Sequence, residues 1–72
     1  MSGKLRHNLQ GRYEIPEETY FTCGDSIEIF YDGEWLKGRI EYSHVIEDYY
    51  FLIEDEQIYI YDLEGVIARR IN

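Results

Sequence analysis

Apolar and polar residues alternate along most of the chain with the period of two that is typical of half-buried β-strands. The clearest alternation covers residues 26–31, where two isoleucines and a tyrosine share one face. The Asp32-Gly33 pair that follows is a strong signal for a two-residue hairpin turn. A second alternating segment, residues 35–42, returns after this turn. The pattern therefore predicts an antiparallel hairpin at the centre of the chain.

Shorter alternating segments predict further strands at 12–15, 20–25, 49–53, 57–61 and 66–71. Turn-forming residues separate these segments, and the only proline, Pro16, ends the first of them. The composition agrees, since Tyr, Ile and Phe are abundant and there is one Met. An all-β fold is predicted, a small antiparallel barrel of five or six short strands.

Segment 35–42 divides by parity into two faces. Leu36 and Ile40 are predicted to line the core, because the opposite choice would bury charged side chains without partners. Gly38 shares their face, and a glycine in mid-strand usually marks a bend or a close backbone approach. The outward face carries Trp35, Lys37 and Arg39. The full predicted core is Tyr13, Ile15, Ile27, Ile29, Leu36, Gly38, Ile40, Phe51, Ile58, Ile60 and Val66.

The charge is strongly acidic, with 15 Asp and Glu against 7 Lys and Arg and a formal net charge of -8. Residues 1–10 are basic and are predicted to form a partly flexible arm, with the barrel domain at 11–72. The net charge argues against binding to a nucleic-acid backbone, which needs clustered cations. No apolar run is long enough for a membrane-spanning helix. With one cysteine, no internal disulfide is possible, and we expect a cytoplasmic protein.

Two segments resemble the core of SH3-like barrels: Cys-Gly-Asp-Ser-Ile-Glu-Ile at 23–29 and Trp-Leu-Lys-Gly-Arg-Ile at 35–40. In that pattern a Gly-Asp turn opens one strand, and the small residue of the later strand packs inside the barrel. The arrangement over residues 11–71 also resembles a family of short uncharacterised bacterial proteins, domain of unknown function 5348. The resemblance implies an SH3-like barrel and an origin on conjugative or phage-like mobile elements.

Catalytic and metal-binding chemistry is not predicted. Cys23 is expected to be a small buried apolar residue, and His7 and His44 are expected to be solvated. Structural zinc usually takes four Cys or His ligands, whereas the chain has one Cys and two His. The acidic turns lack the spacing of a calcium loop. We therefore expect a non-enzymatic protein without cofactor or metal.

The first functional hypothesis is a protein-binding module, which would be a monomer or a weak homodimer. Trp, Tyr and Arg dominate the energetics of protein interfaces. The predicted contact residues are Trp35, Lys37 and Arg39, with Tyr31 and Tyr61 beside them. The alternative for Trp35 is a structural role, in which its side chain covers the open end of the barrel.

The second hypothesis is an acidic mimic of nucleic acid that inhibits a host nucleic-acid-binding protein, of the anti-restriction or anti-CRISPR type. Its surface would be a stripe formed by Glu47, Asp48, Glu54, Asp55 and Glu56. The alternative is that the charge only keeps the protein in solution. Carboxylates gathered in one stripe would favour mimicry, whereas scattered carboxylates and an exposed patch around Trp35 would favour the module.

Overall fold

The computed structural model describes residues 2–71, and these residues form antiparallel β-strands without any helix. The strands are β1 (Ser2–Lys4), β2 (Arg6–His7), β3 (Tyr13–Ile15), β4 (Thr19–Tyr20), β5 (Ser26–Tyr31), β6 (Glu34–Ser43), β7 (Asp48–Ile53), β8 (Ile58–Ile60) and β9 (Ile67–Arg70). The all-β prediction is confirmed. Within residues 2–71 no helix has the length and apolar character needed to cross a membrane.

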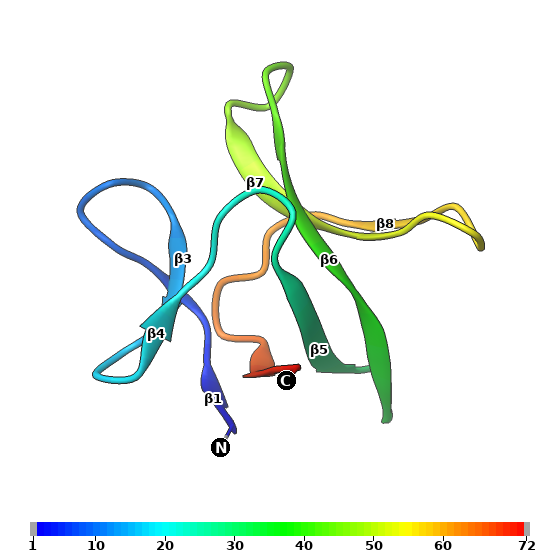
Figure 1. Cartoon of the computed structure of the whole chain (residues 1–72), viewed down its shortest axis with the longest axis horizontal. Coiled ribbons are helices and arrows are strands. Elements are labelled where there is room, and N and C mark those ends of the chain that lie inside the picture. Colours follow the sequence, from blue (N-terminus) through cyan, green and yellow to red (C-terminus); the bar gives the residue numbers. More distant parts are fainter. Residues whose placement is uncertain (1, 72) are drawn as a thin grey trace.

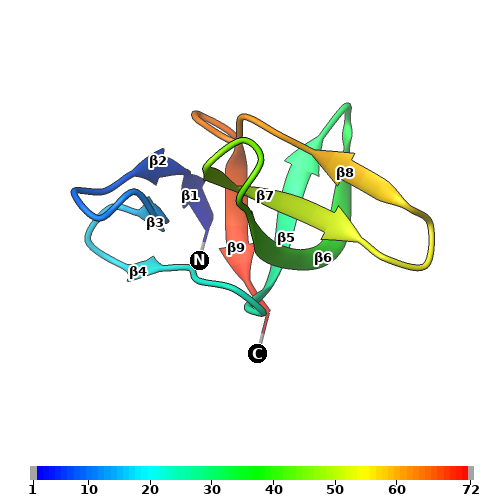
Figure 2. The same ribbon diagram turned by 90° about the horizontal axis from the view of Figure 1, so that it is seen from above.

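The strands form two sheets that lie beside each other (Figures 1 and 2). The larger sheet has the order β1-β9-β5-β6-β7-β8, and the smaller one has the order β2-β3-β4. A closed barrel is not confirmed, because within residues 2–71 no continuous ladder joins the two sheets. Residues 22–25 connect them through isolated backbone bonds instead: Gly24 N–H donates to the Ile40 carbonyl (2.8 Å), and Ile40 N–H donates to the Asp25 carbonyl (2.9 Å).

The long strand β6 is curved and is shared by the two halves of the larger sheet (Figure 2). Its first half pairs with β5 as far as Arg39, and its second half pairs with β7 from Arg39 onward. A Cβ atom at Gly38 would overlap the Leu52 carbonyl oxygen and would lie 2.7 Å from the Phe51 ring. The prediction of a close backbone approach at this glycine is therefore confirmed.

The β5–β6 hairpin has the predicted turn. Tyr31 pairs with Glu34, which leaves Asp32 and Gly33 as the two loop residues. Both have positive φ, 53° at Asp32 and 86° at Gly33. This backbone conformation suits the twist of the flanking strands and favours Asp or Asn followed by Gly.

The core lies between the two sheets and is largely the predicted one. Seven of the eleven predicted core residues are buried: Tyr13, Ile15, Ile27, Ile29, Ile40, Phe51 and Ile60. Leu36, Ile58 and Val66 are half-buried and pack against this cluster. The cluster also includes Leu5, Phe21, Leu63 and Ala68, which the sequence pattern did not single out.

The N-terminal segment pairs with both sheets. Strand β1 pairs with β9, and β2 pairs with β3. Between them Leu5 is 1% exposed, and its backbone bonds with residues of the 65–66 turn: its N–H donates to Val66 and its carbonyl accepts from Gly65. The predicted boundary at residue 10 therefore does not separate two structural units. The flexibility of the segment stays a prediction.

We predict that Gly38→Ala destabilises the protein by about 1–3 kcal/mol, because the added methyl group forces the Leu52 carbonyl and the Phe51 ring away from β6. Urea unfolding followed by circular dichroism measures the free energy of unfolding. Lys37→Ala, an exposed change in the same strand, is the control and should cost less than about 1 kcal/mol. A Gly38→Ala protein as stable as the wild type would contradict the role of this contact.

Candidate functional site

The candidate site lies on the outer face of the larger sheet. The opposite, inner face holds Ala68, Ile27 and Ile29, all fully buried, so the alternating residues of β1, β9, β5 and the first half of β6 point outward. Pairing registers align these residues in rows across the strands. The first row is Lys4, Ile67, Phe30 and Trp35, the second is Ser2, Arg69, Glu28 and Lys37, and the third is Ser26 and Arg39. We call these ten positions the outer face.

Three apolar side chains are adjacent in the first row and form what we call the apolar row: Ile67, Phe30 and Trp35. Phe30 is 43% exposed and Ile67 is 38% exposed. The Phe30 ring meets the Trp35 ring edge to face, with centroids 5.4 Å apart. Apolar side chains that are exposed on adjacent strands form one continuous patch, unlike single exposed residues.

Trp35 is half-buried because neighbours on its own face cover it. The guanidinium carbon of Arg69 lies 3.8 Å from the centroid of the indole ring. Arg69 is itself fixed, because its Nε donates to Glu28 Oε1 at 2.9 Å. Glu28 therefore holds Arg69 through an ion pair, and Arg69 holds the indole of Trp35 through a cation–π contact that reaches across β5. An interface residue held in this way loses little freedom when a partner binds.

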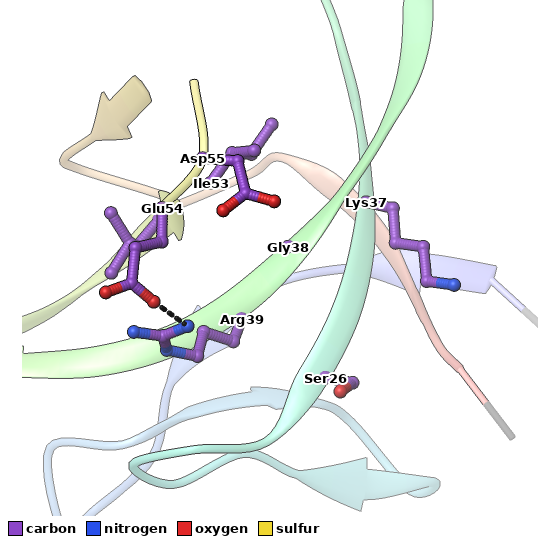
Figure 3. A pocket seen from close by; sticks show the side chains of 8 residues that line it. Ser26, Lys37, Gly38, Arg39, Ile53, Glu54 and Asp55 are labelled. Atoms are coloured by element: carbon purple, nitrogen blue, oxygen red, sulfur yellow. Dashed lines mark hydrogen bonds and ion pairs between the residues drawn. The ribbon is translucent and has the colours of Figure 1, made fainter. Parts of the chain in front are cut away.

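Arg39 borders an open groove of about 390 Å³ at the bend of β6 (Figure 3). Its Nη1 donates to Glu54 Oε1 at 3.0 Å, and its Nε donates to Glu41. These hydrogen bonds raise the pKa of the guanidinium and satisfy its charge. Lys37 extends away from this pair in Figure 3. The two predicted contact cations therefore differ, since Arg39 is neutralised locally and Lys37 is exposed.

The structure does not bring the two predicted tyrosines to Trp35. Tyr31 follows the parity of Ile27 and Ile29, so it lies on the opposite side of β5 from the outer face. Tyr61 comes after β8 and packs against Tyr50, with ring centroids 5.4 Å apart. Burial and the nearby Glu41 charge raise the pKa of the Tyr50 phenol. Tyr61 thus belongs to a separate aromatic cluster over β7 and β8.

The five acidic residues of the mimic hypothesis lie at both ends of β7. Glu47 and Asp48 are at its start, and residues 54–56 follow its end. The strand has six residues, so at about 3.3 Å per residue its ends are about 17 Å apart. Two of these carboxylates also have cationic partners, Asp48 with His7 and Glu54 with Arg39.

His7 is exposed, as expected, but its side chain also joins distant parts of the chain. Its Nδ1 lies 2.7 Å from Glu64 Oε1, and its Nε2 lies 2.9 Å from Asp48 Oδ1. The ring also packs on Tyr13, with centroids 4.2 Å apart. A neutral imidazole has one N–H and could donate to only one of the two carboxylates. We call His7, Asp48, Glu64 and Tyr13 the His7 cluster.

The environment of the His7 cluster favours the protonated imidazolium. Burial opposes protonation, but the hydrogen bonds and charges of Asp48 and Glu64 together outweigh it and raise the pKa of His7 above 6.5. Burial raises the pKa of the Tyr13 phenol to about 12. Its oxygen accepts a hydrogen bond from Leu63 N–H at 2.9 Å. Since the partners of His7 are 41 and 57 residues away in the chain, no local sequence pattern indicates them.

The only thiol is exposed, which corrects the expectation that Cys23 is buried. Phe21, two positions earlier, fills the core instead, and the backbone turns outward at Gly24, where φ is 88°. Among residues 2–71, no group of three or more His, Cys, Asp or Glu side chains is placed to hold a metal ion.

The fold and the outer face together define a small all-β protein whose bent sheet carries an exposed apolar and basic surface. The chain belongs to the family described as Domain of unknown function (DUF5348), whose model matches residues 3–70. The match confirms the family resemblance and includes the last two residues of β1 and all of β2. No curated protein and no solved structure matches the chain.

We predict that the His7 cluster makes stability depend on pH. Because the pKa of His7 is raised above 6.5 in the folded state, its contribution is complete below pH 6.5 and is lost as pH rises through the folded value. The free energy of unfolding of the wild type should therefore fall, relative to His7→Gln, as the pH rises above 6.5. Urea unfolding at several pH values measures this difference. His44→Gln is the control, and equal pH profiles for wild type and His7→Gln would exclude the linkage.

Proposed function

We propose that this protein is a non-enzymatic protein-binding module and that the outer face is its contact surface. The supporting observation is the apolar row, in which Phe30 and Ile67 are exposed and Trp35 is half-buried on three adjacent strands of a chain with a net charge of -8. Trp35 is at its end, held by Arg69 and Phe30, with Lys37 two residues away on the same face. A rigid aromatic anchor surrounded by polar residues is the arrangement found at binding hot spots.

The alternative, an inhibitor that mimics nucleic acid, receives less support. It needs its carboxylates on one continuous surface, whereas β7 separates the two acidic groups and local cations pair with Asp48 and Glu54. A mimic would also bind through charge alone, so the mimic hypothesis does not account for the exposed side chains of the apolar row.

We further propose that the larger sheet is an opened SH3-like barrel, supported by the bent strand β6 that its two halves share. The free, exposed thiol of Cys23 supports a cytoplasmic location, where thiols stay reduced. An origin on a mobile element remains a hypothesis that the family resemblance suggests.

The test compares proteins captured from a lysate of the native host by the wild type and by Trp35→Ala, identified by mass spectrometry. We expect Trp35→Ala to lose the specific partner, because truncating an interface anchor costs at least about 2 kcal/mol, or roughly thirtyfold in affinity. Circular dichroism checks that the variant is folded. Ile67→Ser changes the same apolar row at an exposed position and serves as a second variant.

The matched control is Tyr31→Ala, which removes an exposed aromatic side chain from the other side of the same hairpin. It should capture the same partner as the wild type. If Trp35→Ala and Ile67→Ser both retain the partner, the outer face is not the contact surface. Capture of nucleic-acid-binding proteins independently of Trp35 would instead support the mimic.

A further inference from the structure

The charges of the outer face are opposite to those of the molecule as a whole. Four of the chain's seven Lys and Arg residues lie there, together with one of its fifteen acidic residues, Glu28. The four cations are Lys4, Lys37, Arg39 and Arg69. The other fourteen acidic residues lie outside these ten positions. Three of them border the outer face, because Glu41 and Glu54 pair with Arg39 and Asp55 lines the groove that Lys37 also lines.

Two of these four cations already form ion pairs with carboxylates of the same chain. Arg69 pairs with Glu28, and Arg39 pairs with Glu41 and Glu54. Among residues 2–71, neither Lys4 nor Lys37 has a carboxylate within ion-pair distance. The cations left for a partner are therefore the two lysines.

The two lysines are at opposite ends of the apolar row. Lys4 is the direct neighbour of Ile67 on β1, and Lys37 follows Trp35 by two residues on β6. Neighbouring strands are about 4.8 Å apart, so Lys4 and Trp35, three strands away from each other, are about 14 Å apart. An extended peptide that crosses the strands covers this distance in about four residues.

We propose that the outer face binds an extended acidic segment of a partner protein, with apolar side chains on the apolar row and carboxylates at Lys4 and Lys37. This inference rests on the proposed function and gives the chemical class of the partner. Charge complementarity selects the acidic segment. The acidic remainder of the molecule repels such a segment, so the outer face is where it approaches favourably.

Two other occupants fit the surface less well. A single-stranded nucleic acid would stack its bases on the aromatic rings, but Arg69 already covers a face of the Trp35 ring, and the net charge repels phosphates. A second copy of the chain would place two acidic molecules together, with a charge of -8 on each. Both are tested below as separate outcomes.

The experiment titrates ¹⁵N-labelled protein with three synthetic decapeptides and follows amide and indole shifts by NMR. The first peptide has two Glu residues four positions apart, with Phe and Leu between them. The second replaces each Glu by Lys, and the third replaces Phe and Leu by Ser. We expect the first alone to shift Phe30, Ile67 and the Trp35 indole at peptide concentrations below about 1 mM. The shifts should decrease as salt is added.

Variants test the two lysines directly. Lys4→Gln and Lys37→Gln together should weaken binding of the first peptide roughly tenfold, which is the effect of two partly exposed ion pairs. Gln10→Glu adds the same unit of negative charge as each of these changes, at an exposed loop position away from the outer face, and should leave the affinity within about twofold.

Several results would overturn the inference. These are no shift with the acidic peptide, equal shifts with the Lys peptide, or an affinity unchanged in the double lysine variant. Tighter binding of an oligothymidylate at the same resonances would identify a nucleic acid as the occupant. Shifts that depend on protein concentration without peptide would identify a second copy. If a captured partner depends on Trp35 but its affinity does not change in the double lysine variant, the inference is overturned and the proposed function remains.

Discussion

The close contact between the Gly38 backbone and the Leu52 carbonyl is the constraint on which the rest of this fold depends. It lets β6 bend and change partners at Arg39, from β5 to β7, without ending the strand. A chain of 72 residues has little surface to bury. Strand β6 pairs with both halves of the sheet, and the ring of Phe51 packs in the core beside it. The residues described thus form a core without a disulfide.

The bend also determines which residues are available at the surface. Up to Gly38, β6 lies beside β5 and presents Trp35 and Lys37 on the outer face. After the bend it lies beside β7 and forms pairs such as Glu41 with Tyr50. The basic and apolar surface and the tyrosine cluster are therefore kept apart, although they belong to neighbouring strands. This separation explains why Tyr61 packs with Tyr50 and not near Trp35.

Features encoded over short distances in the chain were predictable. The alternation within β5 and the Asp32-Gly33 turn identify the central hairpin, and parity in β6 places Trp35, Lys37 and Arg39 on one face. The interactions of Leu5 and His7 were not predictable, because their partners are distant in sequence. The division into two sheets was missed for the same reason, since strand patterns do not show which strands pair across the fold. Cys23 was misplaced because the side chain that fills the core belongs to Phe21.

The distribution of charge shows why net charge alone says little about a partner. A formal charge of -8 suggests a basic partner, yet local pairing removes several carboxylates from consideration. Asp48 and Glu64 pair with His7, Glu54 with Arg39, and Glu28 with Arg69. Each of these pairs also fixes a structural element or an aromatic ring. Beside the exposed apolar side chains, the charges without partners are therefore positive, so an acidic protein presents a local surface that favours an acidic ligand.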